Sequence, residues 1–157
     1  MVIPSFPGAV VPHGMIQPSP DTRIDGWDAC SGYYYADSTI NGFSHTHVSG
    51  TGCCDYGDVL LMPTVGKQQY RTTDPQSQRL AYASSFSHKN EIAEPGYYSV
   101  FLDTYQVKAE ISSTKRGAIH RYTFPENTES GFIIDLDYSL QRQTNSEMEI
   151  EVISDTE

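Results

Sequence analysis

The chain has 157 residues, enough for one domain with a hydrophobic core. Its 20 acidic residues outnumber the 10 lysines and arginines, for a formal net charge of −10. This balance disfavours nucleic acids and anionic membrane surfaces as partners, because both are recognised by clustered positive charge. No apolar run approaches the length of a membrane-spanning helix.

The first 58 residues are rich in Gly, Pro, Ser, Asp and His and show little periodicity, which predicts long ordered loops joined by short strands. Residues 1–8 have no basic region and no long apolar stretch, so they do not form a signal peptide. Two explanations stay open: a signal peptide has been removed, or the protein is cytosolic.

Period-two alternation of apolar and polar residues begins at about residue 59 and predicts antiparallel strands. The predicted strands are 59–62, 97–102, 105–111, 118–124, 132–138 and 147–152. Pro63 should end the first of them, and Asp103-Thr104 reads as a tight hairpin turn. Residues 76–85 are the best helical candidate, and a poor one. The fold class is therefore mostly β, an antiparallel β-sandwich over residues 1–157.

The last predicted strand places Met148, Ile150 and Val152 on one face, alternating with glutamates. No pairing partner follows it, and a sandwich that ended there would leave an exposed edge. We therefore expect the domain to be truncated at its C-terminal edge, as a fragment of a longer chain.

Cys30, Cys53 and Cys54 make an odd count, so sequence spacing does not define a disulfide framework. A bridge from Cys30 to Cys53 or Cys54 would form only in an oxidising compartment. Three buried thiols that act as small hydrophobic groups are the favoured alternative.

Residues 41–58 form the densest cluster of polar groups, with two histidines, two cysteines and two aspartates. If the backbone is extended, His45 and His47 project to one side and can bind zinc or copper, with Asp55, Asp58 or a thiolate as third ligand. The favoured alternative is that one histidine is hydrogen-bonded within the loop while the other faces solvent or a ligand.

Aromatic residues suggest a binding surface for sugars, which have apolar C–H faces. The chain has 11 tyrosines, three of them consecutive at Tyr33, Tyr34 and Tyr35, and one tryptophan, Trp27. On a loop, Trp27 would offer a stacking platform for a pyranose ring. The alternatives are a tryptophan in the core and tyrosines that simply favour β-sheets.

Glycoside hydrolysis needs two carboxyl groups on either side of the scissile bond. The candidates in the loop-rich region are Asp21, Asp25, Asp28, Asp37, Asp55 and Asp58. Nothing in their spacing identifies an acid–base pair. A catalytic triad of Ser44, His45 and Asp58 is disfavoured, because the Gly-x-Ser-x-Gly elbow is missing.

Several motifs occur in a fixed order: FPGA at 6–9, VPHGM at 11–15, SPDTR at 19–23, GWD at 26–28, CSGY at 30–33, GFSHTH at 42–47, SGTG at 49–52, GDVLLMP at 57–63, FSH at 86–88, PGYY at 95–98 and HRYTFP at 120–125. Together they resemble the N-terminal part of glycoside hydrolase family 92, the exo-acting α-mannosidases. The resemblance covers residues 6 to about 138, and the stretch from 42 to 63 is the most specific.

The resemblance implies one part of a two-domain bacterial enzyme, secreted or periplasmic, that trims mannose from N-glycans and yeast mannan. A β-sandwich of the galactose-mutarotase type would pack on an (α/α)₆ barrel. That barrel would supply the general acid, the general base and most ligands of a Ca²⁺ ion that contacts mannose hydroxyls. Inversion of the anomeric centre is expected. The chain alone would then have no catalytic residue, no metal site and no activity on mannosides.

By the same resemblance, two loops of this chain would face the barrel and the sugar. The implied substrate-binding residues are Trp27, Asp28, Cys30, His45, Thr46 and His47. Trp27 would pack against a mannose ring, and Asp28 and the two histidines would hydrogen-bond hydroxyl groups or brace the groups that do. Asp55 and Asp58 would hold the glycine-rich loop in shape. The expected partners are mannose-containing glycans and the missing catalytic domain.

The sequence also departs from the family pattern. Pro4-Ser5 stand where the family has His-Thr, Ala29 stands where it often has a second tryptophan, and the doublet Cys53-Cys54 is unusual. Two other functions stay open: a stand-alone carbohydrate-binding module of the same fold, and a small metal-binding protein that uses His45 and His47.

Overall fold

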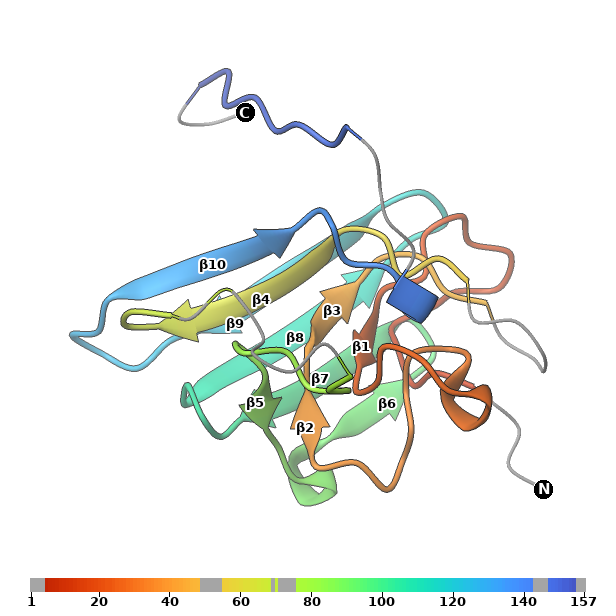
Figure 1. Ribbon diagram of the computed structural model, residues 1–157, viewed down its shortest axis with the longest axis horizontal. Coiled ribbons are helices and arrows are strands. Elements are labelled where there is room, and N and C mark those ends of the chain that lie inside the picture. Colours follow the sequence, from red (N-terminus) through yellow and green to blue (C-terminus); the bar gives the residue numbers. More distant parts are fainter. Residues whose placement is uncertain (1–4, 49–54, 69, 71–75, 143–146, 155–157) are drawn as a thin grey trace.

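The protein is an antiparallel β-sandwich, as predicted. The computed structural model describes residues 5–48, 55–68, 70, 76–142 and 147–154. One four-stranded sheet has, in spatial order, β1 (Ser19–Asp21), β3 (Gly42–Ser44), β4 (Leu60–Val65) and β10 (Ser130–Asp135). The other four-stranded sheet has β6 (Ile92–Glu94), β7 (Tyr97–Leu102), β8 (Val107–Ser113) and β9 (Ala118–Thr123). The short strands β2 (Thr39–Ile40) and β5 (Ser84–Ser85) pair with each other, and every pairing is antiparallel (Figure 1).

The sheet β6-β7-β8-β9 follows directly from the alternation in the sequence. Alternate residues of β7 and β8 are fully buried: Tyr98, Val100, Leu102, Val107, Ala109 and Ile111. The two strands pair in register, with Val100 opposite Ala109, so these side chains share one face. The intervening residue Lys108 is exposed. The predicted inward and outward faces of both strands are confirmed.

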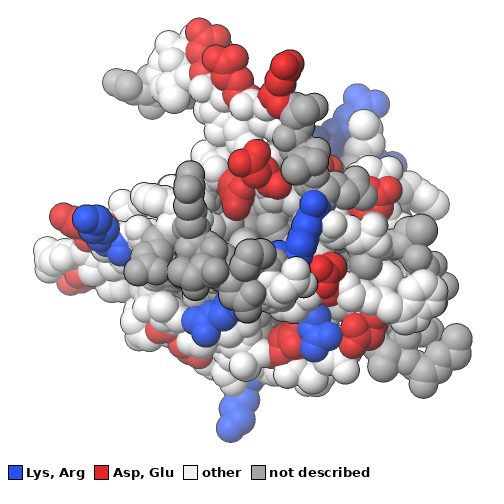
Figure 2. All heavy atoms as spheres, in the orientation of Figure 1, with Lys and Arg blue, Asp and Glu red and all other residues white. Residues whose placement is uncertain are grey.

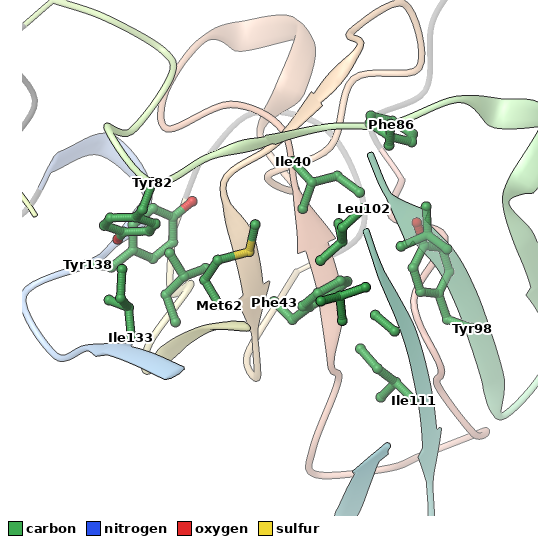
Figure 3. Close-up of a cluster of buried hydrophobic side chains, with 14 of the residues drawn as sticks. Ile40, Phe43, Met62, Tyr82, Phe86, Tyr98, Leu102, Ile111, Ile133 and Tyr138 are labelled. Carbon is green, nitrogen blue, oxygen red and sulfur yellow. The ribbon is translucent and has the colours of Figure 1, made fainter. Parts of the chain in front are cut away.

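The core fills the space between the sheets and extends past β4. Phe43 of β3 lies between the sheets, with its ring centroid 6.4 Å from that of Tyr98 and 6.3 Å from that of Tyr122. Met62 and Ile133 pair in register on the other face of the β1-β3-β4-β10 sheet. There they lie toward Tyr82 and Tyr138 (Figure 3). Both faces of this sheet are therefore covered, and Tyr82 and Tyr138 contribute to the cover on the outer face.

The prediction that Pro63 ends its strand is wrong, because β4 continues to Val65 with Pro63 opposite Phe132 of β10. The pairing of β4 with β3 is at Leu61, so the missing N–H of Pro63 lies beyond that ladder. The hairpin after β7 is also longer than predicted. Residues 103–106 form the turn, Gln106 has a φ of 54°, and β8 starts at Val107. Residues 76–85 form no helix and instead lead into β5.

The predicted strand over residues 147–152 is wrong as well. Residues 147–154 have no regular secondary structure and pair with no strand among the described residues, and they leave the body of the molecule in Figure 1. Met148, Ile150 and Val152 are exposed to 45, 51 and 78%. An amphipathic strand needs a sheet on which to bury its apolar face, and here that face stays uncovered.

Charge is distributed as the composition suggests. Acidic side chains gather on the C-terminal segment and are spread over the rest of the face shown in Figure 2, where lysines and arginines lie scattered among them. In the part of the chain that the structure describes, no helix is long and apolar enough to span a membrane.

Candidate functional site

Trp27 lies on the surface and not in the core. It opens a single 3₁₀ turn, η1 (Trp27–Ala29), and is 71% exposed. The inner side of the turn is held by Ala29 and Cys30, which are 1 and 2% exposed, and the Cys30 Sγ lies 3.1 Å from the Trp27 carbonyl oxygen. The small buried residues anchor the turn, so the indole projects into solvent. Cys30 is therefore an anchor of this turn, and a bridge to Cys53 or Cys54 lies outside the described residues.

Arg23 fixes the carboxylate beside Trp27. Its guanidinium donates to both oxygens of Asp37, at 2.9 and 3.0 Å, and to Asp28 at 3.1 Å. It also lies over the ring of Tyr34, 3.9 Å from the centroid. The hydrogen bond to Asp37, and then the charges of both carboxylates, raise the pKa of Arg23. Asp28 keeps a half-exposed carboxylate of fixed direction, which can accept hydrogen bonds from hydroxyl groups.

A second exposed aromatic ring, that of Tyr35, packs on the ring of a histidine. It is 70% exposed and stacks on His88, with centroids 4.2 Å apart and an interplanar angle of 16°. His88 Nδ1 lies 2.6 Å from Glu91, whose side chain is 8% exposed and also accepts from the Tyr33 and Tyr98 hydroxyls at 3.0 and 2.7 Å. Burial, and then the nearby Glu91 charge, raise the pKa of Tyr33. Sequence reasoning noted the tyrosine run but missed His88 and Glu91, which are more than 50 residues away.

His47 is buried, and its side chain is wholly inaccessible. Its Nδ1 lies 2.7 Å from the Gln17 carbonyl oxygen and its Nε2 lies 2.8 Å from Asp21 Oδ1. Both ring nitrogens are therefore engaged by oxygen atoms of the protein. Ser44 Oγ completes the cluster, 2.5 Å from Asp21 Oδ2 and 3.0 Å from His47 Nε2. His47 thus lies where it braces the loop.

Asp21 connects the two loops that were predicted to face the sugar. Its side chain binds the Ser44–His47 segment, and the backbone N–H of the adjacent Thr22 donates to the Gly32 carbonyl oxygen at 2.7 Å. Gly32 has a φ of 80°, and a Cβ there would stand 2.1 Å from Asp21 Oδ1. Sequence reasoning proposed Asp21 only as a candidate acid, but it is a fully buried pairing partner.

The prediction that His45 and His47 project to one side is wrong, because β3 ends at Ser44 and the chain bends at His45. His45 Nδ1 lies 2.8 Å from the Val59 carbonyl oxygen, and its Nε2 lies 3.1 Å from His120 Nε2. These contacts share no group with those of His47, so a metal site built on His45 and His47 is not formed. The disfavoured triad of Ser44, His45 and Asp58 is not formed either.

Thr46 and Asp58 form two hydrogen bonds with each other. The Thr46 hydroxyl donates to Asp58 Oδ2 at 2.8 Å and accepts from the Asp58 N–H at 3.0 Å. These contacts join the two described segments on either side of residues 49–54, which lie outside the described residues. Asp55 is exposed and accepts a hydrogen bond from the adjacent Tyr56 N–H at 2.9 Å.

Comparison with known proteins agrees with this architecture. Residues 3–157 match the glycosyl hydrolase family 92 N-terminal domain. A family GH92 α-mannosidase from Bacteroides thetaiotaomicron is 41% identical with a TM-score of 0.82, over 89% of this chain and 19% of that one. A family GH92 inverting mannosidase from the same organism is 31% identical with a TM-score of 0.70, over 86% of this chain and 17% of that one.

A curated relative, an uncharacterized secreted glycosidase from Arthroderma benhamiae, is 31% identical over 78% of this chain and 16% of its own length. The chain therefore spans less than a fifth of these relatives. The match over nearly all of its own residues, with the shared β-rich fold, settles its family: the chain belongs to glycosyl hydrolase family 92, whose N-terminal domain it matches.

Proposed function

We propose that this chain provides sugar-contacting loops and scaffolding to a calcium-dependent, inverting exo-α-mannosidase that trims α-linked mannose from glycans. The observation that carries the proposal is the exposed Trp27 beside the oriented Asp28. The indole is 71% exposed, so its flat face is available to a ligand or partner. The flat indole suits the C–H face of a pyranose, and the carboxylate of Asp28 accepts hydroxyl hydrogens.

The acid and the base of the reaction are proposed to come from outside this chain. An inverting mechanism needs two carboxyl groups about 6.5–9.5 Å apart, with one free to activate water. Asp21 is sealed against His47 and Ser44, and Asp28 and Asp37 are held by Arg23. The family GH92 relative described as an inverting mannosidase supports this stereochemistry. We therefore expect no hydrolysis of mannosides by the chain alone.

The calcium ion is also proposed to be bound elsewhere. Ca²⁺ takes six to eight oxygen ligands, several of them carboxylates. Among the residues that the structure describes, no group of three or more His, Cys, Asp or Glu side chains is arranged to hold a metal ion. The described residues therefore do not fit calcium, and the role proposed for Trp27 and Asp28 does not depend on it. A secreted or periplasmic location is proposed, supported by the relative named as a secreted glycosidase.

The test is the substitution Trp27→Ala in the enzyme that contains this chain. Loss of a stacking platform worth about 1–1.5 kcal/mol should lower kcat/KM on α-mannosides about tenfold, and Trp27→Phe should retain most of it. Tyr70→Ala is the matched control, because Tyr70 is 72% exposed but lies on neither loop. Unchanged activity in Trp27→Ala would remove the basis of the proposal.

The same variants address the alternative of a stand-alone carbohydrate-binding module, which the two exposed rings of Trp27 and Tyr35 also suit. Saturation-transfer NMR of the isolated chain with mannose measures binding directly. Transfer that disappears in Trp27→Ala would favour the binding module. Absence of transfer, together with a catalytic defect in the enzyme, would favour a pocket that is complete only with the rest of the protein.

A further inference from the structure

A pair of histidines lies between the two sheets, away from the Trp27 turn. His45 follows β3 and His120 is on β9, 75 residues further along the chain. Their Nε2 atoms are 3.1 Å apart, and their ring centroids are 4.9 Å apart at an interplanar angle of 36°. Both residues are only partly buried, so a small solute can reach them from solvent.

The outer nitrogen of each ring is anchored on oxygen. His45 Nδ1 donates to the Val59 carbonyl oxygen at 2.8 Å, and His120 Nδ1 lies 2.7 Å from the Tyr122 hydroxyl. In protein metal sites a ligating histidine almost always has its other ring nitrogen held by such an oxygen, which fixes the ring and the tautomer. Here both rings have that support, and the two remaining nitrogens, both Nε2, lie 3.1 Å apart.

The spacing of the two Nε2 atoms is that of two ligands on one ion. Bonds of about 2.0–2.1 Å from imidazole nitrogen to zinc that meet at about 90–110° place the nitrogens about 2.8–3.4 Å apart. The observed 3.1 Å lies in this interval. We propose that His45 and His120 form a binding site for a divalent transition metal ion, Zn²⁺ or Cu²⁺, whose other positions are filled by water.

Proton balance is simple at this site. The neutral arrangement has the Tyr122 hydroxyl donating to His120 Nδ1, His120 Nε2 donating to His45 Nε2, and His45 Nδ1 donating to Val59. For the ion to bind, the His120 proton moves from Nε2 to Nδ1 and the Tyr122 oxygen becomes the acceptor. Both Nε2 lone pairs are then available, and no proton leaves the protein. Imidazole ligands select Zn²⁺ and Cu²⁺ over Ca²⁺, so this site is separate from the proposed calcium.

Copper is the sharpest probe, because electron paramagnetic resonance of Cu²⁺ counts the coordinated nitrogens. The tag-free chain with one equivalent of Cu²⁺ should show hyperfine coupling to two imidazole nitrogens, and calorimetric titration with Zn²⁺ should give one site. His45→Gln and His120→Gln should each weaken binding at least tenfold. His13→Asn is the matched control: it removes an exposed histidine at a φ of 59°, which asparagine tolerates, and should leave the affinity unchanged.

Circular dichroism establishes that each variant is folded before it is titrated. If His120→Gln does not fold, His45→Gln decides alone, because His45 lies on a bend outside the strands. Retention of the wild-type affinity in folded His45→Gln would overturn the proposal. So would a copper spectrum with one coordinated nitrogen, or a loss of binding in His13→Asn equal to that in His45→Gln.

Discussion

Asp21 is the residue on which both loops of the candidate site depend. Its carboxylate is inaccessible and holds His47 and Ser44, while Gly32 of the other loop passes directly against it. A buried carboxylate is tolerated only when its oxygens are paired, which explains the two hydrogen-bonding side chains around it. The loop that presents the exposed Trp27 and Asp28 is therefore connected to the buried hydrogen bonds of Asp21.

The close approach of Gly32 gives a prediction at this scale. Gly32→Ala should destabilise the fold by several kcal/mol, because the new Cβ would meet Asp21 Oδ1 at 2.1 Å in addition to the strain of a φ of 80°. Gly66→Ala is the matched control, since its φ of 73° is similar but the added Cβ meets nothing within 4 Å. It should cost only about 1 kcal/mol. Urea unfolding measures both, and equal losses would refute the contact.

At the scale of elements, β8 and β9 carry an ionic pair on the outer face of their sheet. Glu110 and Arg121 are directly opposite in register, and the guanidinium donates to the two carboxylate oxygens at 2.9 and 2.8 Å. Tyr97 of β7 donates to the same carboxylate at 2.9 Å. The hydrogen bond from Arg121, and then that from Tyr97, lower the pKa of Glu110 to about 2. One side chain thus links three neighbouring strands.

This pairing predicts a pH dependence. Because the folded-state pKa of Glu110 lies below its unfolded value of 4.5, its stabilising contribution is complete above pH 4.5 and is lost as the pH falls toward 2. Glu110→Gln should therefore lower the free energy of unfolding at pH 6 and flatten its decline between pH 5 and 2. Urea titrations at several pH values test this. A decline in the variant as steep as in the wild type would assign the acid sensitivity to other groups.

The elements that sequence reasoning found are those that local patterns define. β7 and β8 were predictable because burial on one face produces alternation, as at Tyr98, Val100 and Val107. The continuation of β4 past Pro63 was not predictable, because it depends on where the neighbouring short strand β3 ends. The prediction of a strand over residues 147–152 was wrong. Alternation in the sequence shows that one face of a segment is apolar, but it does not show which other element would cover that face.

The candidate site shows the same division. The motifs pointed to Trp27, Asp28 and the histidine-rich loop. The exposure of Trp27, however, depends on its small neighbours Ala29 and Cys30, which are buried and anchor the turn. The supports of the site come from far along the chain, as Glu91 does for Tyr33 and His120 does for His45. Contacts over 58 and 75 residues leave no local signal that a single sequence can reveal.

At the scale of the whole molecule, apolar side chains remain exposed on β10 and β9, the outermost described strands on one side of the sandwich. β10 is the outermost described strand of its sheet, with Phe132 and Ile134 exposed to 52 and 49%, and Ile119 on β9 is 71% exposed. Unpaired strand edges with apolar side chains promote association, even for a chain with a net charge of −10.

We therefore expect the isolated chain to self-associate at micromolar concentrations. Ile134→Lys should shift it toward monomer, because a charge on an edge strand opposes pairing with another chain. Ser130→Lys places the same charge on β10 without removing apolar surface and should have a smaller effect. Sedimentation velocity over a range of concentrations distinguishes the species. A wild-type chain that stays monomeric throughout would show that these edges are adequately protected.

The position of the single indole has a practical consequence. The chain contains one tryptophan, and it is exposed on the turn that we propose contacts the sugar. Its fluorescence will therefore respond to a ligand or protein surface that covers that turn, and only weakly to unfolding of the interior. Trp27 fluorescence can therefore be used to measure binding at this turn, whereas unfolding of the core has to be followed through the tyrosines.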